Sequence, residues 1–257
     1  MAPQGDLNAP DFVVELSRRE SAATWDVTGG IAVANPTYAH SHEQNRLLLT
    51  EPTPWAVALA DAERVQAEAG LAHRRVDWLN GAPPDVPDVL PDGWSLSRTV
   101  FMELTRDLVG EPGAAELLTF DDVRTALWAD WRSHLPDVPD EVIEHLAGRR
   151  RATERACAVT WHAVVLDGEV VSFCDLRVMA VGDELMAQIE DVVTLPAHRG
   201  HGYARMIVVH AVRAAQAAGA DRIWLEADAD DWPREFYSRM GFTECGPTPV
   251  VAMRQLP

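Results

Sequence analysis

The pattern of apolar and polar positions changes its period along the chain, and each change predicts a new element. Residues 94–104 alternate between apolar and polar and are rich in β-forming residues, which is typical of a strand. Residues 203–218 are rich in alanine and are followed by Gly219, which predicts a helix that ends at a glycine. Read in the same way, the rest of the C-terminal part contains a helix beginning at Asp121 or Asp122, helices over 140–151 and 233–240, strands over 156–165, 170–178, 184–195 and 222–227, and a last hairpin within 242–256.

The connection between two of these strands is itself informative. The runs 156–165 and 170–178 are joined across Asp167-Gly168, and Asp-Gly between two apolar runs is a strong hairpin signal. The complete order is a strand, two helices, three strands, and then helices alternating with strands. This order predicts an α/β (α+β) fold in which a mixed sheet is flanked by helices.

Proline and glycine cluster between residues 81 and 93 and mark the best linker candidate in the chain. We therefore expect an N-terminal α/β segment, 1–92, and a C-terminal domain, 93–257. The N-terminal segment has a strand-helix-strand rhythm like that of the second half of the C-terminal part. Its three elements are expected over 45–49, 55–70 and 73–79. The segment is either a degenerate half-copy of the C-terminal fold or an extra layer on it.

Composition narrows the class of protein. The chain has 257 residues, of which 47% are apolar, so it can bury a sizeable core. No apolar run approaches the ~18 residues that span a bilayer, and the first residues lack the pattern of a signal peptide. Cys157, Cys174 and Cys245 are too scattered for a disulfide framework or a metal site. These features predict a cytoplasmic protein without a bound metal.

Charge narrows the range of partners. The chain has 40 acidic and 22 basic residues, which gives a net charge of −18. Because phosphate binding depends on Lys and Arg, this balance disfavours nucleic acid and anionic membranes as partners. It favours a cationic molecule such as an amine, although acidity also serves solubility by itself. The one basic run, 149–151, is expected to be the solvated end of a helix.

The most informative stretch is the turn between the strand that ends near Pro196 and the helix that begins near Tyr203. Gly200 and Gly202 let the backbone approach a ligand closely, and the first N–H groups of the helix have no partner inside it. Together with the helix dipole, this arrangement suits a pyrophosphate. The two glycines alone would also fit an ordinary strand-to-helix turn. The third glycine of a dinucleotide fingerprint and the Lys-Ser/Thr pair of a P-loop are both missing.

The fuller context of this turn resembles the acyl-CoA signature of the GNAT superfamily, Arg/Gln-x-x-Gly-x-Gly/Ala. Arg199, Gly202 and Ala204 occupy its three positions. Pro196 stands three residues before the arginine, where members of that family often have proline.

A second stretch, 236–242, is similar to the Leu-Tyr-x-x-x-Gly-Phe box of the same family. Asp230 and Pro233 depart from the Asn and Ala that are common upstream of that box. With the hairpin at Asp167-Gly168, the resemblance extends over about 94–257.

The resemblance implies where a co-substrate binds. Members of this family hold acyl-CoA between two splayed parallel strands, so acetyl-CoA is expected here as the co-substrate. The backbone of Val192, Val193 and Thr194 would pair with the pantetheine arm. The pyrophosphate would be held by the N–H groups of the following turn, which are those of Arg199, Gly200, His201, Gly202, Tyr203 and Ala204.

Direct attack of an amine on a thioester needs a base, for which the resemblance implies Glu190. Family members often place this base nine or eleven residues before the signature arginine, which here gives Glu190 or Gln188. Strand alternation puts both on one face with Val192 and Thr194, and puts Asp191 on the other. A carboxylate there can take the proton directly or through water. The alternative is a solvated or salt-bridged strand residue.

The departing thiolate needs an acid, and the resemblance implies Tyr237, because a phenol can donate a proton. The alternative is a ring that packs in the core, as expected for Phe236 and Phe242. His162 and Cys174 lie in apolar strands and are expected to be structural.

The predicted function is therefore an N-acetyltransferase that moves an acetyl group from acetyl-CoA to a primary amine of a small, cationic molecule. Two alternatives stay open. One is a CoA-binding sensor or scaffold without turnover, and the other is an acyl or aminoacyl transferase with a different donor. A homodimer is one option for the oligomeric state.

Overall fold

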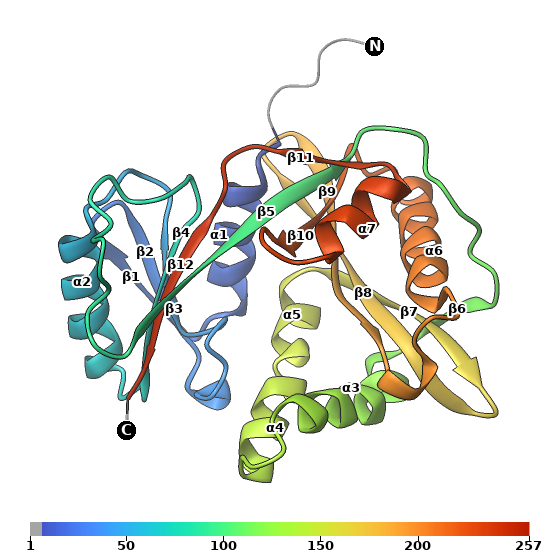
Figure 1. The fold of residues 1–257 in the computed structure, drawn as a ribbon, viewed down its shortest axis with the longest axis horizontal. Coiled ribbons are helices and arrows are strands. Elements are labelled where there is room, and N and C mark those ends of the chain that lie inside the picture. Colours follow the sequence, from blue (N-terminus) through green and yellow to red (C-terminus); the bar gives the residue numbers. More distant parts are fainter. Residues whose placement is uncertain (1–6, 257) are drawn as a thin grey trace. The chain divides into compact units, whose positions relative to one another are not determined.

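The structure is a computed structural model that describes residues 7–256, and its chain divides into two compact units. The first unit comprises the residues up to Phe101 together with 227–232 and the end of the chain from Cys245. The second unit comprises 102–226 and 233–244. Figure 1 shows the elements of both units along the chain.

The elements that lie mainly in the first unit are α1 (Ala9–Glu20), β1 (Ala23–Val27), β2 (Gly30–Ala34), η1 (Pro36–Tyr38), β3 (Arg46–Leu49), α2 (Trp55–Glu68), β4 (His73–Trp78), β5 (Trp94–Leu104) and β12 (Val250–Gln255). Those that lie mainly in the second are β6 (Ala115–Leu118), α3 (Phe120–His134), α4 (Asp140–Gly148), α5 (Arg150–Ala156), β7 (Ala158–Leu166), β8 (Glu169–Val181), β9 (Glu184–Thr194), η2 (Pro196–His198), α6 (Tyr203–Ala217), β10 (Arg222–Asp228), α7 (Pro233–Met240) and β11 (Phe242–Cys245).

The first unit is built on a sheet in the order β1-β2-β3-β4-β12-β5. Its neighbours are antiparallel except β3 and β4, which are parallel and joined by α2 as the crossover. Apolar residues of α2 recur at helical spacing, so they form one stripe that packs on the sheet. In this core the ring of Trp55 stacks on that of Trp78 with centroids 5.5 Å apart.

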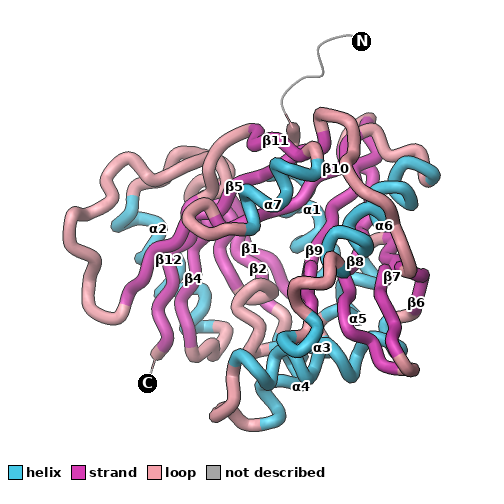
Figure 2. Tube along the Cα trace, turned by 45° about the vertical axis from the view of Figure 1, so that its right-hand side comes forward, coloured by secondary structure: helices cyan, strands magenta, loops and turns pink. Residues whose placement is uncertain are grey.

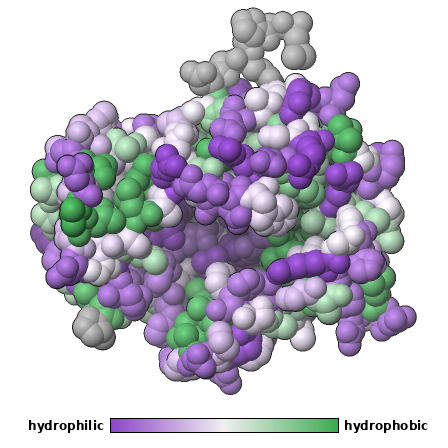
Figure 3. Space-filling model, in the orientation of Figure 1, coloured by the Kyte–Doolittle hydropathy of each residue, from purple (hydrophilic) through white to green (hydrophobic). Residues whose placement is uncertain are grey.

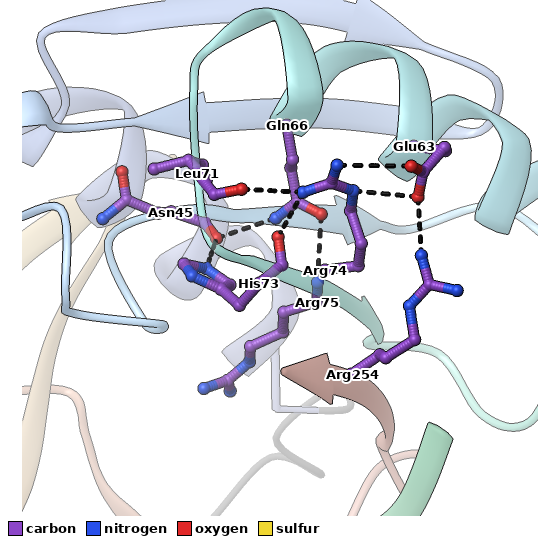
Figure 4. Close-up of polar contacts among 8 residues, drawn as sticks. All are labelled: Asn45, Glu63, Gln66, Leu71, His73, Arg74, Arg75 and Arg254. Carbon is purple, nitrogen blue, oxygen red and sulfur yellow. Dashed lines mark hydrogen bonds and ion pairs between the residues drawn. The ribbon is translucent and has the colours of Figure 1, made fainter. Parts of the chain in front are cut away.

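Polar side chains tie α2 to the strands beside it (Figure 4). Arg74 of β4 donates to Glu63 of α2 over 2.9 Å, and Arg254 of β12 donates to the same carboxylate over 2.9 Å. Gln66 of α2 donates from Nε2 to the carbonyl of Asn45 over 2.9 Å. Gln66 is 1% exposed, so these bonds satisfy groups that burial would otherwise leave without water.

The second unit contains a sheet in the order β10-β9-β8-β7-β6. Its neighbours are antiparallel except β9 and β10, which are parallel and joined by α6. Phe173 of β8 packs in a core with α3, whereas the thiol of its neighbour Cys174 meets the carbonyl of Ile207 in α6. Since adjacent strand residues point to opposite faces, α3 and α6 cover the two faces of this sheet, as Figure 2 shows.

Several predicted elements are confirmed, and two helix boundaries are corrected. The strand over 94–104 and the helix over 233–240 match β5 and α7. Helix α3 begins earlier than predicted, because Thr119 is its N-cap and forms a capping box with Asp122. The helix predicted over 140–151 is two helices, α4 and α5, which meet at Arg149.

The first predicted hairpin is confirmed and the last one is wrong. Asp167 and Gly168 both have positive φ, 51° and 85°, as a two-residue hairpin turn between β7 and β8 requires. At the end of the chain, however, β11 pairs with β5, and β12 pairs with β4 and β5 rather than with β11. Ala252 of β12 is fully buried in the core under α2, and this burial favours the pairing with β4.

The two units repeat one order of elements. In each, a helix precedes an antiparallel pair, and a third antiparallel strand then leads through a helix into a parallel strand. The connection from β3 into α2, residues 50–54, contains Pro52 and Pro54 and no glycine, unlike the connection from β9 into α6. This repeat favours the degenerate half-copy over the extra layer, and the choice between them stays a prediction. The division of the sequence into domains 1–92 and 93–257 stays a prediction.

The surface seen in Figure 3 is largely polar. On the face shown in Figure 3, polar side chains cover most of the surface and apolar ones form separate patches. Of the helices within residues 7–256, none is long and apolar enough to cross a membrane.

Candidate active site

The turn between β9 and α6 has the geometry expected of an anion-binding backbone. Gly200 and Gly202 have φ of 83° and 82°, a region that other residues rarely adopt, and Gly202 is the N-cap of α6. Apart from its chain neighbours, a Cβ added at either glycine would meet no atom of residues 7–256 within 4 Å. Within the described part of the chain, no side chain caps this end of α6, so its first N–H groups are not occupied by a capping residue.

Side chains of the same turn brace it from within. The Nε of Arg199 donates to the carbonyl of Thr194 over 3.1 Å and so closes the turn onto the end of β9. The ring of His201 stacks on that of Tyr203, with centroids 5.6 Å apart, and its Nδ1 lies 3.0 Å from the carbonyl of Arg199. These contacts rigidify the backbone whose N–H groups form the candidate site.

The parallel pair β9 and β10 separates before its strands end. Its ladder joins 186–189 to 222–225 and stops there, although β9 continues to Thr194 and β10 to Asp228. The other edge of β9 stays paired with β8 as far as Thr194, which lies opposite Ser172. Val192, Val193 and Thr194 therefore lie on a strand edge beyond the β10 ladder, as the splayed arrangement requires.

A bulge interrupts β9 next to Glu190. Glu190 lies opposite Asp175, and Val193 lies opposite Phe173, so two residues of β9 face the single Cys174. Asp191 sits in this bulge with a φ of 50°.

This bulge overturns the predicted strict alternation of faces. The extra residue returns Val193 to the face of Glu190 and moves Thr194 to the other face, where its hydroxyl lies 2.9 Å from that of Ser172. The Asp191 side chain is not on the opposite face from Glu190 either. Its carboxylate accepts from Nε of Arg150 over 2.7 Å, and the same Nε lies 3.8 Å from Asp175, on the face of Glu190.

The two candidate catalytic side chains share one neighbourhood. Glu190 is half-buried and accepts a hydrogen bond of 2.9 Å from Nε2 of Gln188. Tyr237 is 7% exposed. Burial is the main cause that raises the pKa of Tyr237, and the Glu190 carboxylate and Cys174 raise it further. The phenol is therefore protonated at neutral pH, and it lies near enough to Glu190 to sense its charge.

Residues 120–242 match the model of the acetyltransferase (GNAT) family. The chain carries a GNAT acetyltransferase domain. A sequence comparison finds streptothricin acetyltransferase of Streptomyces lavendulae, 37% identical over 94 residues, which are 36% of this chain and 49% of that protein. The match thus spans about half the length of this curated relative.

Solved structures extend the likeness of fold to nearly the whole chain. A GCN5-related N-acetyltransferase from Kribbella flavida matches with a TM-score of 0.62 at 17% identity, covering 96% of this chain and 95% of that one. A functionally unknown conserved protein from Staphylococcus epidermidis matches with a TM-score of 0.61 at 12% identity, covering 91% and 93%. The predicted α+β fold with a mixed, helix-flanked sheet is confirmed.

The GNAT domain also contains buried charges that sequence reasoning missed. Arg150 was expected at a solvated helix end, but it is 3% exposed and binds Asp191. Asp175 and Arg177 are 0% and 2% exposed and form a two-point ion pair over 3.0 and 3.2 Å. Charged residues inside the apolar run of β8 were the available signal, because a buried charge needs a partner.

One further carboxyl lies on the α3 side of the domain. Asp130 is 9% exposed, and burial raises its pKa, with partial opposition from His134 and a further increase from Asp191. Among residues 7–256, no group of three or more His, Cys, Asp or Glu side chains is arranged to hold a metal ion.

Proposed function

We propose that the protein transfers an acetyl group from acetyl-CoA to a primary amine of a small, cationic molecule. The observation that carries the proposal is the order of three features along β9 and the turn that follows it. Within 15 residues of β9 and its turn, Glu190 is followed by the strand edge beyond the β10 ladder and then by the open glycines at the start of α6. A base, a strand edge for an amide-containing arm and an anion site would thus follow one another in the order that an acyl-CoA needs.

The donor would be held mainly by backbone. The N–H and C=O groups of Val192, Val193 and Thr194 would pair with the pantetheine amides along the edge of β9. The N–H groups of residues 199–204 would bind the pyrophosphate, which the helix dipole and the unhindered glycines favour.

The reaction would use the two neighbouring side chains. Glu190 would accept a proton from the ammonium, so that the nitrogen can attack the thioester carbonyl carbon. As the C–N bond forms and the C–S bond breaks, Tyr237 would give its proton to the departing thiolate, and the attacking nitrogen would pass its second proton to the resulting phenolate. With its raised pKa the Tyr237 phenol carries that proton at neutral pH.

The acceptor is proposed from charge and from the curated relative. Glu190, Asp191 and Asp130 bring carboxyl groups to the α3 side of the sheet, and the chain carries a net charge of −18. Both features favour an ammonium over an anion. The relative is a streptothricin acetyltransferase, so streptothricin is the first acceptor to test.

The deciding experiment is calorimetric titration of acetyl-CoA into the protein. We expect micromolar binding that Gly202→Trp abolishes, because a side chain there would enter the open space at the start of α6. Gly182→Trp is the matched control. Gly182 also has a positive φ, 58°, and it lies at the opposite end of β9. Apart from its chain neighbours, no described residue lies within 4 Å of a Cβ added there.

Turnover is then measured as CoA release with streptothricin and a panel of amines. Binding with release supports the proposal. Binding without release from any amine would favour a CoA-binding sensor. A wild-type protein that does not bind acetyl-CoA would overturn the proposal and favour a different donor.

A further inference from the structure

A chain of polar side chains runs from the buried interior of the sheet to Glu190. Arg177 and Gln188 lie directly opposite each other on β8 and β9, and Asp175 and Glu190 form the next such pair. Residues that are opposite, or two apart on one strand, point to the same face. The four side chains are therefore neighbours on one face because of the strand register.

The four side chains contact one another in the order Asp175, Arg177, Gln188, Glu190. Arg177 donates to both oxygens of Asp175, from Nε over 3.0 Å and from Nη2 over 3.2 Å. Its Nη1 lies 3.5 Å from Oε1 of Gln188, and Nε2 of Gln188 lies 2.9 Å from Oε2 of Glu190. Asp175, Arg177 and Gln188 are each at most 3% exposed, so water does not compete strongly for these groups.

The Arg177 guanidinium and the Glu190 carboxylate, which lie on either side of the Gln188 amide, decide how that amide is oriented. A guanidinium carries only donors, so the amide atom facing Arg177 must be the oxygen. The amide nitrogen then faces the Glu190 carboxylate, which accepts. The reverse orientation would set N–H groups against the guanidinium and oxygen against the carboxylate, so both contacts would be unfavourable.

We propose that Gln188 is a positioning residue: Arg177 fixes its amide, and its Nε2 holds Oε2 of the base Glu190. The inference rests on the proposed function, because Gln188 can position a base only if Glu190 acts as one. A hydrogen bond donated to a carboxylate stabilises the charged form, so Gln188 keeps Glu190 ionised and fixes its rotamer. Gln188 stands at the second position where the family resemblance allows a base, and an amide there cannot act as one.

Other groups also act on the charge of Glu190, and they come from several elements. Asp175 faces it from β8 and Tyr237 from α7, and Asp191 follows it in the bulge with its partner Arg150 from α5 and with Asp130 of α3 nearby. The test must therefore change Gln188 alone and leave these charges in place.

The first readout is independent of activity. The side-chain carboxyl of Glu190 is titrated by carbon NMR in the full-length protein, with Glu190→Gln to assign the signal. Gln188→Met keeps length and volume but removes the donor, and we expect the titration midpoint to rise by about one pH unit. Gln188→Glu sets a like charge beside Glu190 and should raise it as well, which keeps the test open if Gln188→Met does not fold.

The matched control is Gln66→Met, which removes an equally buried amide in the first unit. It should leave the midpoint where it is. A midpoint that moves in neither Gln188 variant would overturn the inference.

The second readout is the pH profile of kcat/KM for the acceptor. We expect its acidic limb to move up with the NMR midpoint in Gln188→Met, while KM for acetyl-CoA stays unchanged. A fall in kcat without movement of the limb would show a merely structural role for Gln188. A wild-type protein without acetyltransferase activity would overturn the proposed function, and the NMR midpoint would still decide whether Gln188 controls Glu190.

Discussion

Nδ1 of His162 in β7 lies 2.8 Å from Nδ1 of His210 in α6. A hydrogen bond between these atoms needs one ring to donate and the other to accept, so both rings cannot be protonated together. His162 is 0% exposed, and its Nε2 lies 3.0 Å from the hydroxyl of Thr160. Burial, and secondarily His210, lower the pKa of His162 to about 4.

This pair predicts a loss of stability on mild acidification. Between the unfolded pKa near 6.5 and the folded value of about 4, only the unfolded chain binds the His162 proton, so stability falls as the pH falls through this window. From pH 7 to 5 we expect His162 to contribute a loss of about 2 kcal/mol in the free energy of unfolding.

Urea denaturation at both pH values measures this loss, and His162→Gln should remove most of it. His134→Gln, at an exposed histidine of α3, is the control and should retain it. Equal pH dependence in the wild type and His162→Gln would contradict the prediction.

Glu190→Gln should lower kcat by about 10²- to 10⁴-fold, the usual contribution of a positioned base. Because the proposed donor contacts are backbone groups of β9 and the turn, calorimetry should show unchanged affinity for acetyl-CoA. Glu169→Gln, at an exposed glutamate of β8, should leave both quantities unchanged. A Glu190→Gln protein with full kcat would reduce Glu190 to a structural strand residue.

Tyr237→Phe should lower kcat by about 10²-fold and leave the fold intact, because the ring still packs against Phe242 with the same shape. The raised pKa of Tyr237 also predicts that the wild-type rate does not fall up to about pH 10, the ordinary pKa of a phenol. Steady-state kinetics across pH test both points, with Tyr38→Phe in the first unit as the control. An unchanged kcat would assign Tyr237 to packing alone.

Gly241→Ala should destabilise the second unit by about 3 kcal/mol, because two costs add at this position. Gly241 has a φ of 112°, and an added Cβ would lie 2.7 Å from the carbonyl oxygen of Asp107. Gly168→Ala shares the positive φ, but its Cβ meets none of residues 7–256 within 4 Å beyond its chain neighbours, so it should cost only about 1 kcal/mol. Chemical denaturation compares the two, and equal losses would show that the close approach to Asp107 is relieved without cost.

The local elements of the fold could be predicted from the sequence. Gly200 and Gly202 adopt the positive φ that their place before a helix implies, and Asp167-Gly168 forms the hairpin turn it predicts. The alternation over 94–104 marks β5 correctly. These features depend on neighbours within a few residues, so the order of residues carries the information directly.

The relation between distant segments was decided by the tertiary structure. The bulge at Asp191 exists because β9 pairs with β8 in two registers, and it is this pairing that turns Thr194 away from the face of Glu190. Likewise, β12 pairs with β4, some 175 residues away, because Ala252 fits the core under α2. Strand pairing and burial depend on which surfaces meet, and a single sequence does not state this.

The candidate site likewise combines features that short motifs predicted with features that depend on strand pairing. The turn signature, Glu190 and Tyr237 were predicted from motifs, since each is a short pattern with a fixed spacing. The chain from Asp175 through Arg177 and Gln188 to Glu190 was not, because it depends on the register of β8 against β9. The sequence by itself determined which chemical groups and local turns are present. Only the tertiary structure decided which buried groups touch, because hydrogen bonds across a sheet follow its register rather than the order of the chain.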